Sequence, residues 1–208
     1  WYLLRYAGGQ LHWEKWDLIG ASSGFECQTA GRHTIHVDPN GVVYVGTDYG
    51  AIATCVGGVC TWEQAIESDS GGCPYDDGDF STGIDDIFAT GSSKLYALDP
   101  GNSGGLYYKN GGDWVAVPLA HHASRIVGFW GGPVYVAGYD AWSKVDGTQV
   151  TPMPMPSGIS SVNGPQIRGI WGPDSNTVYL AISGDLYKYS GGGWTEIDTP
   201  SGSVKGIG

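Results

Sequence analysis

The sequence predicts an all-β fold made of a repeated unit of short strands, and three observations support this prediction. An apolar strand pattern containing a tyrosine recurs in steps of 39 to 52 residues, at Tyr44, Tyr96, Tyr135 and Tyr179. A tryptophan opens the last strand of the unit, at Trp13, Trp62, Trp114 and Trp194. The chain also has 36 glycines, which suits many tight turns. A repeat of this length built only of strands is typical of radial sheets, so we expect residues 1–208 to form one five-bladed β-propeller domain.

Each predicted blade has strands A to D, from the central channel outward, and each strand is a short apolar or aromatic run between turn residues. The A strands are predicted at His33–Val37, Asp86–Ala89, Ile126–Trp130, Ile167–Trp171 and Val204–Gly208. The B strands are predicted at Val42–Gly46, Lys94–Leu98, Pro133–Ala137 and Thr177–Ala181. The C strands are predicted at Tyr2–Tyr6, Ala51–Cys55, Leu106–Lys109, Trp142–Val145 and Leu186–Tyr189. The D strands are predicted at Leu11–Asp17, Thr61–Ile66, Trp114–Pro118, Val150–Pro154 and Trp194–Asp198.

Three expectations follow from this assignment. The tryptophans that open the D strands are expected to pack between neighbouring blades, and Gly128, Gly169 and Gly206 are expected at matching A-strand positions. The first and last segments are expected to share one blade, because the chain begins at a C strand and ends on an A strand. That blade lacks a B strand, so we expect additional chain, a strand from a partner in self-association, or a three-stranded blade.

Composition narrows the classes of partner. The net charge of −11 disfavours binding to nucleic acid and to anionic membrane surfaces. No run of about 18 apolar residues is present, so no membrane insertion is expected. The chain begins at Trp1, which fits either a removed signal segment or a fragment of a longer protein.

The four cysteines are predicted to form two disulfides. Cys55 and Cys60 flank a four-residue hairpin loop, which brings opposed residues within disulfide distance. Cys27 and Cys73 lie in corresponding segments between blades and form the second expected pair. Two disulfides indicate an oxidising compartment and hence a secreted or cell-surface protein. A zinc site is the alternative, although the C-x₄-C spacing has no matching second pair.

An acidic segment precedes the second A strand. Eight of the 21 acidic residues lie between Glu63 and Asp86. Within it, the spacing of Asp76, Asp77 and Asp79 around a glycine suits a hard cation such as Ca²⁺, and Tyr75 and Phe80 are candidate stacking faces for a ligand. The alternative is a solvated acidic loop that Cys73 holds in place.

Further candidate ligand-binding residues lie on the same expected rim, which carries the D–A loops and the B–C turns. Asp48, Asp99 and Asp140 fall at equivalent B–C turns, and His121 and His122 lie in a D–A loop. Carboxylates beside Tyr49 and Tyr139 offer acceptors and aromatic faces to a sugar. The alternative for each aspartate is a turn in which its side chain bonds its own backbone, and the alternative for the histidines is an exposed loop.

Known catalytic signatures are absent. The sequence has neither a G-x-S-x-G elbow nor a phosphate-binding G-x-x-x-x-G-K loop. Carboxylates are numerous, but a glycosidase needs two at a defined separation across a cleft.

The phrase Ile170-Trp171-Gly172, followed by Val178-Tyr179 and Gly193-Trp194, resembles the degenerate repeats of secreted and surface bacterial β-propellers related to kelch proteins. A second copy contains Phe129-Trp130-Gly131 and Val134-Tyr135. The blade count is similar to that of tachylectin-like lectins and five-bladed glycosidases. This resemblance implies a rigid display scaffold.

We therefore expect an extracellular, non-catalytic binding or adhesion module for carbohydrate or a cell-surface protein. A self-assembling surface protein and a glycosidase-like enzyme are the alternatives.

Overall fold

The computed structural model describes residues 2–7, 10–15, 32–47, 50–65, 83–99, 105–159 and 167–199, together with Val204. These residues form four four-stranded antiparallel sheets and one two-stranded sheet, and contain no helix. Each four-stranded sheet is a meander in which consecutive strands pair. The all-β prediction is confirmed, whereas the number of five blades stays a prediction because four complete sheets are seen.

The strand bounds follow the repeat closely. The first sheet consists of β3 (Arg32–Val37), β4 (Val43–Thr47), β5 (Ala51–Val56) and β6 (Val59–Gln64). The second consists of β7 (Asp86–Gly91), β8 (Lys94–Asp99), β9 (Gly105–Asn110) and β10 (Val115–Val117). The third consists of β11 (Ala123–Gly128), β12 (Val134–Gly138), β13 (Trp142–Asp146) and β14 (Gln149–Pro152). The fourth consists of β15 (Ile167–Asp174), β16 (Thr177–Ile182), β17 (Asp185–Ser190) and β18 (Gly193–Ile197).

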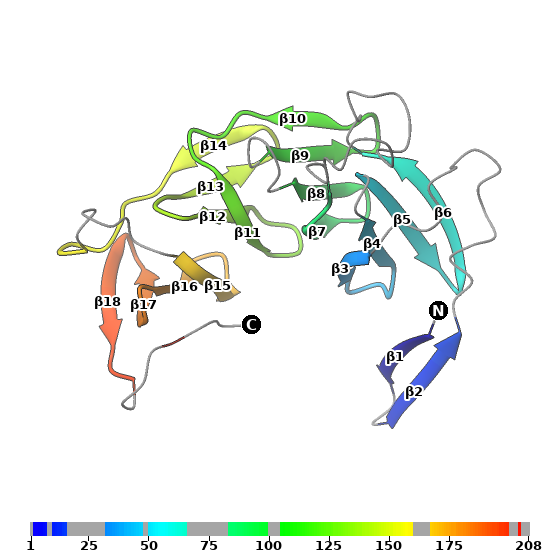
Figure 1. Ribbon diagram of the computed structural model, residues 1–208, viewed down its shortest axis with the longest axis horizontal. Helices are drawn as coiled ribbons and strands as arrows, with labels where there is room; N and C mark the ends of the chain where they lie inside the picture. Colours follow the sequence, from blue (N-terminus) through cyan, green and yellow to red (C-terminus); the bar gives the residue numbers. More distant parts are fainter. Residues whose placement is uncertain are drawn as a thin grey trace, which may run out of the picture.

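The four sheets are arranged radially in an arc (Figure 1). The first strand of each sheet lies on the inner side of the arc and contacts the first strand of the next, from β3 through β7 and β11 to β15. The fourth strands lie on the outside. This radial order matches the predicted sequence of strands A to D.

The hydrophobic core lies between the sheets. Tyr44 of β4 packs against the second sheet and Tyr96 of β8 packs against the third. Tyr135 of β12 packs against the fourth, and its hydroxyl donates a hydrogen bond to the Ser175 carbonyl at 2.8 Å. The strands that carry these tyrosines are largely buried. Neighbouring sheets lie on both sides of the second and third sheets, which contain β8 and β12. The recurring tyrosine of the sequence is therefore the residue that joins one sheet to the next.

The tryptophans of the outer strands complete these layers. Trp114 packs against the core between the first two sheets, and Trp194 against the core between the last two. The predicted packing between blades is thus confirmed for these two residues. Trp62 contacts the cluster on the other face of the first sheet, where Val43, Val45 and Ala53 are buried.

The remaining short sheet pairs β1 (Tyr2–Ala7) with β2 (Gln10–Lys15). This is the pair of outer strands expected at the start of the chain. The A strand predicted at 204–208 lies outside the described residues except for Val204, whose amide donates to the Gly184 carbonyl at 2.8 Å. The shared blade therefore stays a prediction.

Two details of the predicted inner strands are wrong. The third begins at Ala123 and ends at Gly128, so Trp130 lies in the following turn. Gly128 pairs with the residue before Tyr135, whereas Gly169 pairs two residues after Tyr179. Gly128 and Gly169 are therefore not equivalent, because the two Trp-Gly phrases that aligned them occupy a turn in one sheet and a strand in the other.

Within the described residues, no helix has the length and apolar composition needed to cross a membrane.

Candidate functional site

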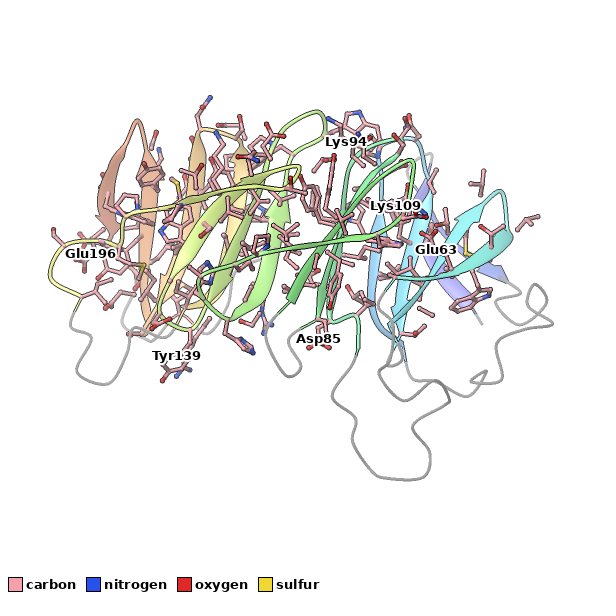
Figure 2. The ribbon with its side chains drawn as sticks, turned by 90° about the horizontal axis from the view of Figure 1, so that it is seen from above. Glu63, Asp85, Lys94, Lys109, Tyr139 and Glu196 are labelled. Atoms are coloured by element: carbon pink, nitrogen blue, oxygen red, sulfur yellow. A yellow bond between two sulfur atoms is a disulfide. The ribbon has the colours of Figure 1, made fainter. Side chains whose placement is uncertain are left out.

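One edge of the arc carries the ends of β4, β8, β12 and β16 together with the starts of the four inner strands, β3, β7, β11 and β15. We call this edge the loop rim. Asp85 and Tyr139 lie on it, and Lys94 lies on the opposite edge (Figure 2). Backbone hydrogen bonds join consecutive sheets here. The Ile84 amide donates to the Thr47 carbonyl at 2.8 Å, and the Ile167 amide donates to the Tyr139 carbonyl at 3.1 Å. The expectation that D–A loops and B–C turns share one rim is confirmed for these segments.

The inner strands are irregular where they meet the loop rim. The pairing register shifts across His33 in β3, Ser124 in β11 and Arg168 in β15, so each strand has one extra residue there. The second sheet has a related feature, since the Asp85 amide donates to the carbonyl of Leu98, which pairs with Asp86. Bulges of this kind turn side chains out of the regular alternation. Asp85 and Arg168 are exposed at these positions.

Asp86 links two of the inner strands. Its Oδ1 accepts a hydrogen bond from the Ile87 amide at 3.0 Å, and its Oδ2 accepts one from the Ile126 amide of β11 at 3.2 Å. Burial raises the pKa of this carboxyl to about 6, against the lowering effects of the two amides and of Arg125. Both oxygens are thus engaged with backbone, which makes Asp86 a structural link between the second and third sheets.

Replacing Asp86 with asparagine is expected to flatten the pH dependence of stability. Because the folded-state pKa of about 6 lies above the ordinary value of 3.8, the proton is bound more tightly in the folded state. This contribution is fully present below the ordinary pKa and is lost as the pH rises through the folded-state value. The shift corresponds to at most about 3 kcal/mol.

Urea denaturation of the wild type and the variant across this pH window measures the effect. Asp140→Asn serves as the control, because Asp140 is an exposed carboxyl. An Asp86→Asn protein that keeps the full pH slope of the wild type would show that another group is responsible.

The third sheet carries the best-defined part of the loop rim. The Nδ1 atom of His121 lies 3.2 Å from the His122 carbonyl oxygen, and its Nε2 atom lies 3.0 Å from the Ser143 hydroxyl. A carbonyl oxygen can only accept, so Nδ1 carries a proton and donates to His122, while Nε2 and the Ser143 hydroxyl form the second hydrogen bond. Ser143 is buried. These two bonds hold the His121–His122 segment against β13.

Gly138 brings the neighbouring turn onto the same segment. A Cβ atom at this position would overlap the His122 carbonyl oxygen, so only glycine allows so close an approach. The next residues are Tyr139, which is 50% exposed, and Asp140, which is exposed. His122 therefore lies close along the backbone to Tyr139 and Asp140, and we call these three residues the rim patch. It contains an aromatic ring, a carboxylate and an imidazole.

The other predicted site residues have different positions. Asp99 is buried, and its Oδ1 accepts a hydrogen bond from the Gly83 amide at 3.4 Å, which fixes the entry to β7. Several predicted residues lie outside the described residues, namely Asp48, Tyr75, Asp76, Asp77, Asp79, Phe80, Cys27 and Cys73. The Ca²⁺ site and the second disulfide therefore stay predictions. In the part of the chain that is described, no group of three or more His, Cys, Asp or Glu side chains is placed to hold a metal ion.

The Cys55–Cys60 disulfide is present, with a Cα–Cα distance of 4.0 Å between paired residues of β5 and β6.

Sequence reasoning missed two features. The bulges that place Asp85 and Arg168 have no clear sequence signal, since they depend on pairing between strands. The sequence predicts Glu63 to be part of the acidic segment, whereas in the structure it forms an ion pair with Lys109 of the next sheet. A Glu on one outer strand and a Lys on the adjoining strand of the following repeat could have suggested that pairing.

This geometry defines the chain as a β-propeller protein, and the solved structures that are similar to it are β-propellers too. Virginiamycin B lyase from Staphylococcus aureus has a TM-score of 0.61 and 14% identity, over 93% of this chain and 61% of that chain. YCF48 from Cyanidioschyzon merolae has a TM-score of 0.59 and 17% identity, over 99% of this chain and 66% of that one.

PorZ, a surface component of the type-IX secretion system of Porphyromonas gingivalis, has a TM-score of 0.57 and 16% identity, over 86% of this chain and 24% of that one.

These similarities show the fold alone. The chain spans about three fifths of the length of the two lyase structures that it matches, at 61% and 55%. No protein-family model matches the sequence, and no curated protein matches it. The relation to kelch or tachylectin-like proteins stays a resemblance.

Proposed function

We propose that this protein is an extracellular, non-catalytic binding module that recognises carbohydrate through the loop rim, with the rim patch as the contact surface. The observation that carries the proposal is the exposed Tyr139–Asp140 pair, which follows Gly138 at the close approach to His122. An exposed aromatic ring provides a flat apolar face for a sugar ring, and a neighbouring carboxylate accepts hydrogen bonds from hydroxyl groups. The fixed His121–His122 segment lowers the entropy cost of ordering the site on binding.

Two observations support the proposed extracellular location. The Cys55–Cys60 disulfide fits an oxidising compartment. PorZ, one of the proteins with a similar fold, is described as a bacterial surface component. We propose the same type of location for this chain.

A non-catalytic role is favoured over a glycosidase-like role by the bonding of Asp86. A catalytic acid needs a raised pKa and an oxygen that can reach the substrate. Asp86 has the raised pKa, but each of its two oxygens already accepts a hydrogen bond from a backbone amide. Virginiamycin B lyase shares the fold and is named as an enzyme, so hydrolysis or elimination of bound glycans is a useful additional readout.

A glycan array tests the proposal. The wild type is expected to bind a defined subset of glycans, and the double variant Tyr139→Ala, Asp140→Asn is expected to lose at least about tenfold in affinity, as removal of one stacking face and one charged acceptor predicts. Lys94→Ala, on the opposite edge, is the matched control and should bind as the wild type does.

Absence of any glycan binding, or equal binding by the double variant, would contradict the proposal. Capture of a cell-surface protein whose glycans have been removed, with loss of capture in the double variant, would instead assign a protein partner to the same patch.

A second candidate function is self-association through β1 and β2. These strands form only a two-stranded sheet among the described residues, and the edge of such a sheet can accept a strand from another chain. Analytical ultracentrifugation over a range of concentrations tests it, with a concentration-dependent oligomer as the expected result and a strict monomer as the contradicting one.

A further inference from the structure

A pocket of about 250 Å³ lies between the first and second sheets. Its walls come from β5 and β6 on one side and from β9 and the β7–β8 turn on the other. Ser92 and Ser93 line it and directly precede Lys94, which lies on the edge opposite the one that carries Tyr139 (Figure 2). We call it the inter-sheet pocket.

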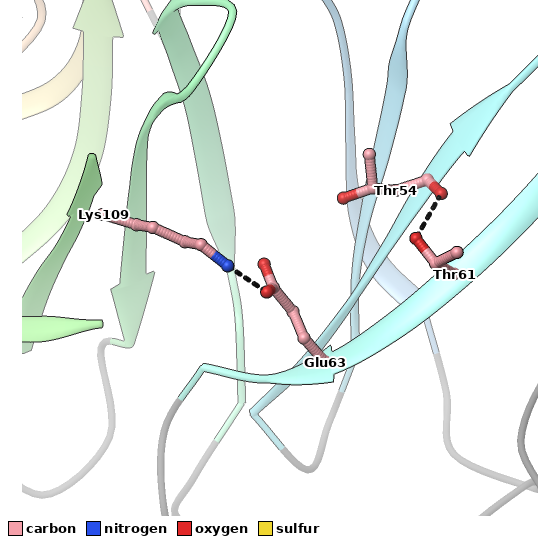
Figure 3. A network of polar contacts seen from close by, with 4 residues as sticks. All are labelled: Thr54, Thr61, Glu63 and Lys109. Atoms are coloured by element: carbon pink, nitrogen blue, oxygen red, sulfur yellow. Dashed lines mark hydrogen bonds and ion pairs between the residues drawn. The ribbon is translucent and has the colours of Figure 1, made fainter. Parts of the chain in front are cut away.

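An ion pair crosses this pocket. The Nζ atom of Lys109 on β9 bonds to Oε2 of Glu63 on β6 (Figure 3). The two side chains are 20% and 31% exposed, so solvent and small solutes can reach them. Glu63 uses Oε2 in this bond, and its second oxygen, Oε1, is a further acceptor. The Lys109 ammonium has three N–H donors, and its Nζ atom also lies 5.8 Å from the centroid of the Trp114 ring. The pocket therefore contains a carboxylate and an ammonium next to each other, and each can form a further hydrogen bond with a ligand.

Hydroxyl groups line the walls beside this pair. The Thr61 hydroxyl donates to the Thr54 carbonyl at 3.3 Å (Figure 3), and the Ser93 hydroxyl donates to the Asn110 side-chain oxygen at 3.4 Å. Because each hydroxyl donates its only hydrogen to a protein acceptor, its oxygen can still accept a hydrogen bond from a ligand.

Tyr44 and Leu95 add a small apolar part to the lining of the pocket. The two residues are 3% and 6% exposed. The pocket therefore combines a small apolar surface with hydroxyl oxygens and a neutral pair of opposite charges. This combination matches a polyhydroxylated ring better than a purely apolar or an ionic ligand.

We infer that the inter-sheet pocket binds one neutral monosaccharide unit. One hydroxyl of a vicinal diol would donate to Oε1 of Glu63, while the oxygen of the neighbouring hydroxyl accepts from Lys109. The C–H face of the sugar would lie toward the small exposed parts of Tyr44 and Leu95. A ligand with a net charge would have to compete with the ion pair, whereas a diol bonds to both partners and leaves the pair intact. The volume lies just below the range of about 300–1,000 Å³ that holds drug-sized ligands, which limits the occupant to a single ring.

The inference goes beyond the proposed function, because none of the pocket residues belongs to the rim patch. The test is an NMR titration of the isotope-labelled full chain with the methyl glycosides of glucose, galactose, mannose and N-acetylglucosamine. At least one of them is expected to shift the amide signals of Thr61, Ser93 and Lys109, with a dissociation constant on the order of millimolar, as is typical of a contact that involves few bonds.

Two variants examine the ion pair. Glu63→Gln and Lys109→Met are each expected to weaken this binding by about tenfold, because each removes a charged hydrogen-bonding partner. Glu196→Gln and Lys94→Met are the matched controls, since Glu196 and Lys94 are exposed on β18 and β8 and lie outside the pocket (Figure 2). Both controls should bind like the wild type.

Thermal melting checks that the variants fold. If Glu63→Gln unfolds, Glu63→Asp, which keeps the charge, replaces it. The shorter aspartate side chain is expected to weaken binding as well. The rim variant Tyr139→Ala, Asp140→Asn should still bind the monosaccharide, so failure of the rim proposal and failure of this one are distinguishable. The inference is overturned if no glycoside shifts the pocket signals, if Glu63→Gln and Lys109→Met bind as well as the wild type, or if only a zwitterionic amino acid binds there.

Discussion

Replacing Trp142 with alanine is expected to lower the free energy of unfolding by about 3–5 kcal/mol, the usual cost of removing a buried aromatic side chain. Trp142 is 1% exposed and lies at the centre of the contact between the third and fourth sheets. Its ring centroid is 5.6 Å from that of Tyr135, 5.2 Å from that of Tyr189 and 5.3 Å from that of Trp194. Its indole N–H donates to the Pro154 carbonyl at 2.9 Å.

Differential scanning calorimetry measures this effect, and for a chain of this size the loss corresponds to a decrease in melting temperature of roughly 10 °C. Trp130→Ala is the matched control, because Trp130 is 42% exposed in a turn. The control should change stability by less than about 1 kcal/mol. A Trp142→Ala protein as stable as this control would contradict the assignment of Trp142 to the contact between sheets.

Replacing Gly138 with alanine is the second change with a large expected effect. The new methyl group would overlap the His122 carbonyl oxygen, so the His121–His122 segment must move away from the β12–β13 turn. That movement breaks the bond between His121 and Ser143. We expect a loss of about 3 kcal/mol, at the upper end of the range for overpacking, together with loss of glycan binding at the rim patch.

Gly112→Ala is the control for Gly138→Ala. The position has no heavy atom within 4 Å of an added Cβ, so this variant should have the stability and binding of the wild type. Urea denaturation and the glycan array measure the two properties. If Gly138→Ala keeps both, the close approach of the two segments is not what holds the rim patch in place.

The sequence was sufficient for the strand order because the relevant signals are local. Alternating apolar residues and glycine turns indicate strands and their ends, and the recurring tyrosine marks the second strand of each sheet. Tyr96 shows why this residue recurs: it is buried against the third sheet, and its hydroxyl accepts a hydrogen bond from the Gly147 amide at 2.7 Å. A tyrosine at this position can contact the following sheet, and one such contact is formed between each pair of consecutive sheets.

Features that depend on contacts between distant strands could not be predicted in the same way. The extra residue at Arg168 shifts β15 relative to β16, and this shift is invisible in a one-dimensional pattern. The similar phrases around Trp130 and Trp171 suggested an equivalence that the pairing register does not support. Likewise, the ion pair between Glu63 and Lys109 joins residues 46 positions apart.

The candidate rim residues were predictable only in part. Their common edge followed from the order of strands, but the role of each side chain depends on its burial. Asp99 and Asp140 occupy corresponding turns in the sequence, yet Asp99 is buried and bonded to Gly83, while Asp140 is exposed. Equivalent positions in a repeat can therefore serve structure in one sheet and remain accessible to a ligand in another.

The most direct test of the central claim is to locate a bound glycan on the labelled protein by amide chemical-shift mapping, using the strongest glycan from the array. The account predicts that the largest changes fall on His122, Tyr139 and Asp140, and that they disappear in the Tyr139→Ala, Asp140→Asn variant. Changes centred on the opposite edge, around Lys94 and Trp130, with none at the rim patch, would contradict it.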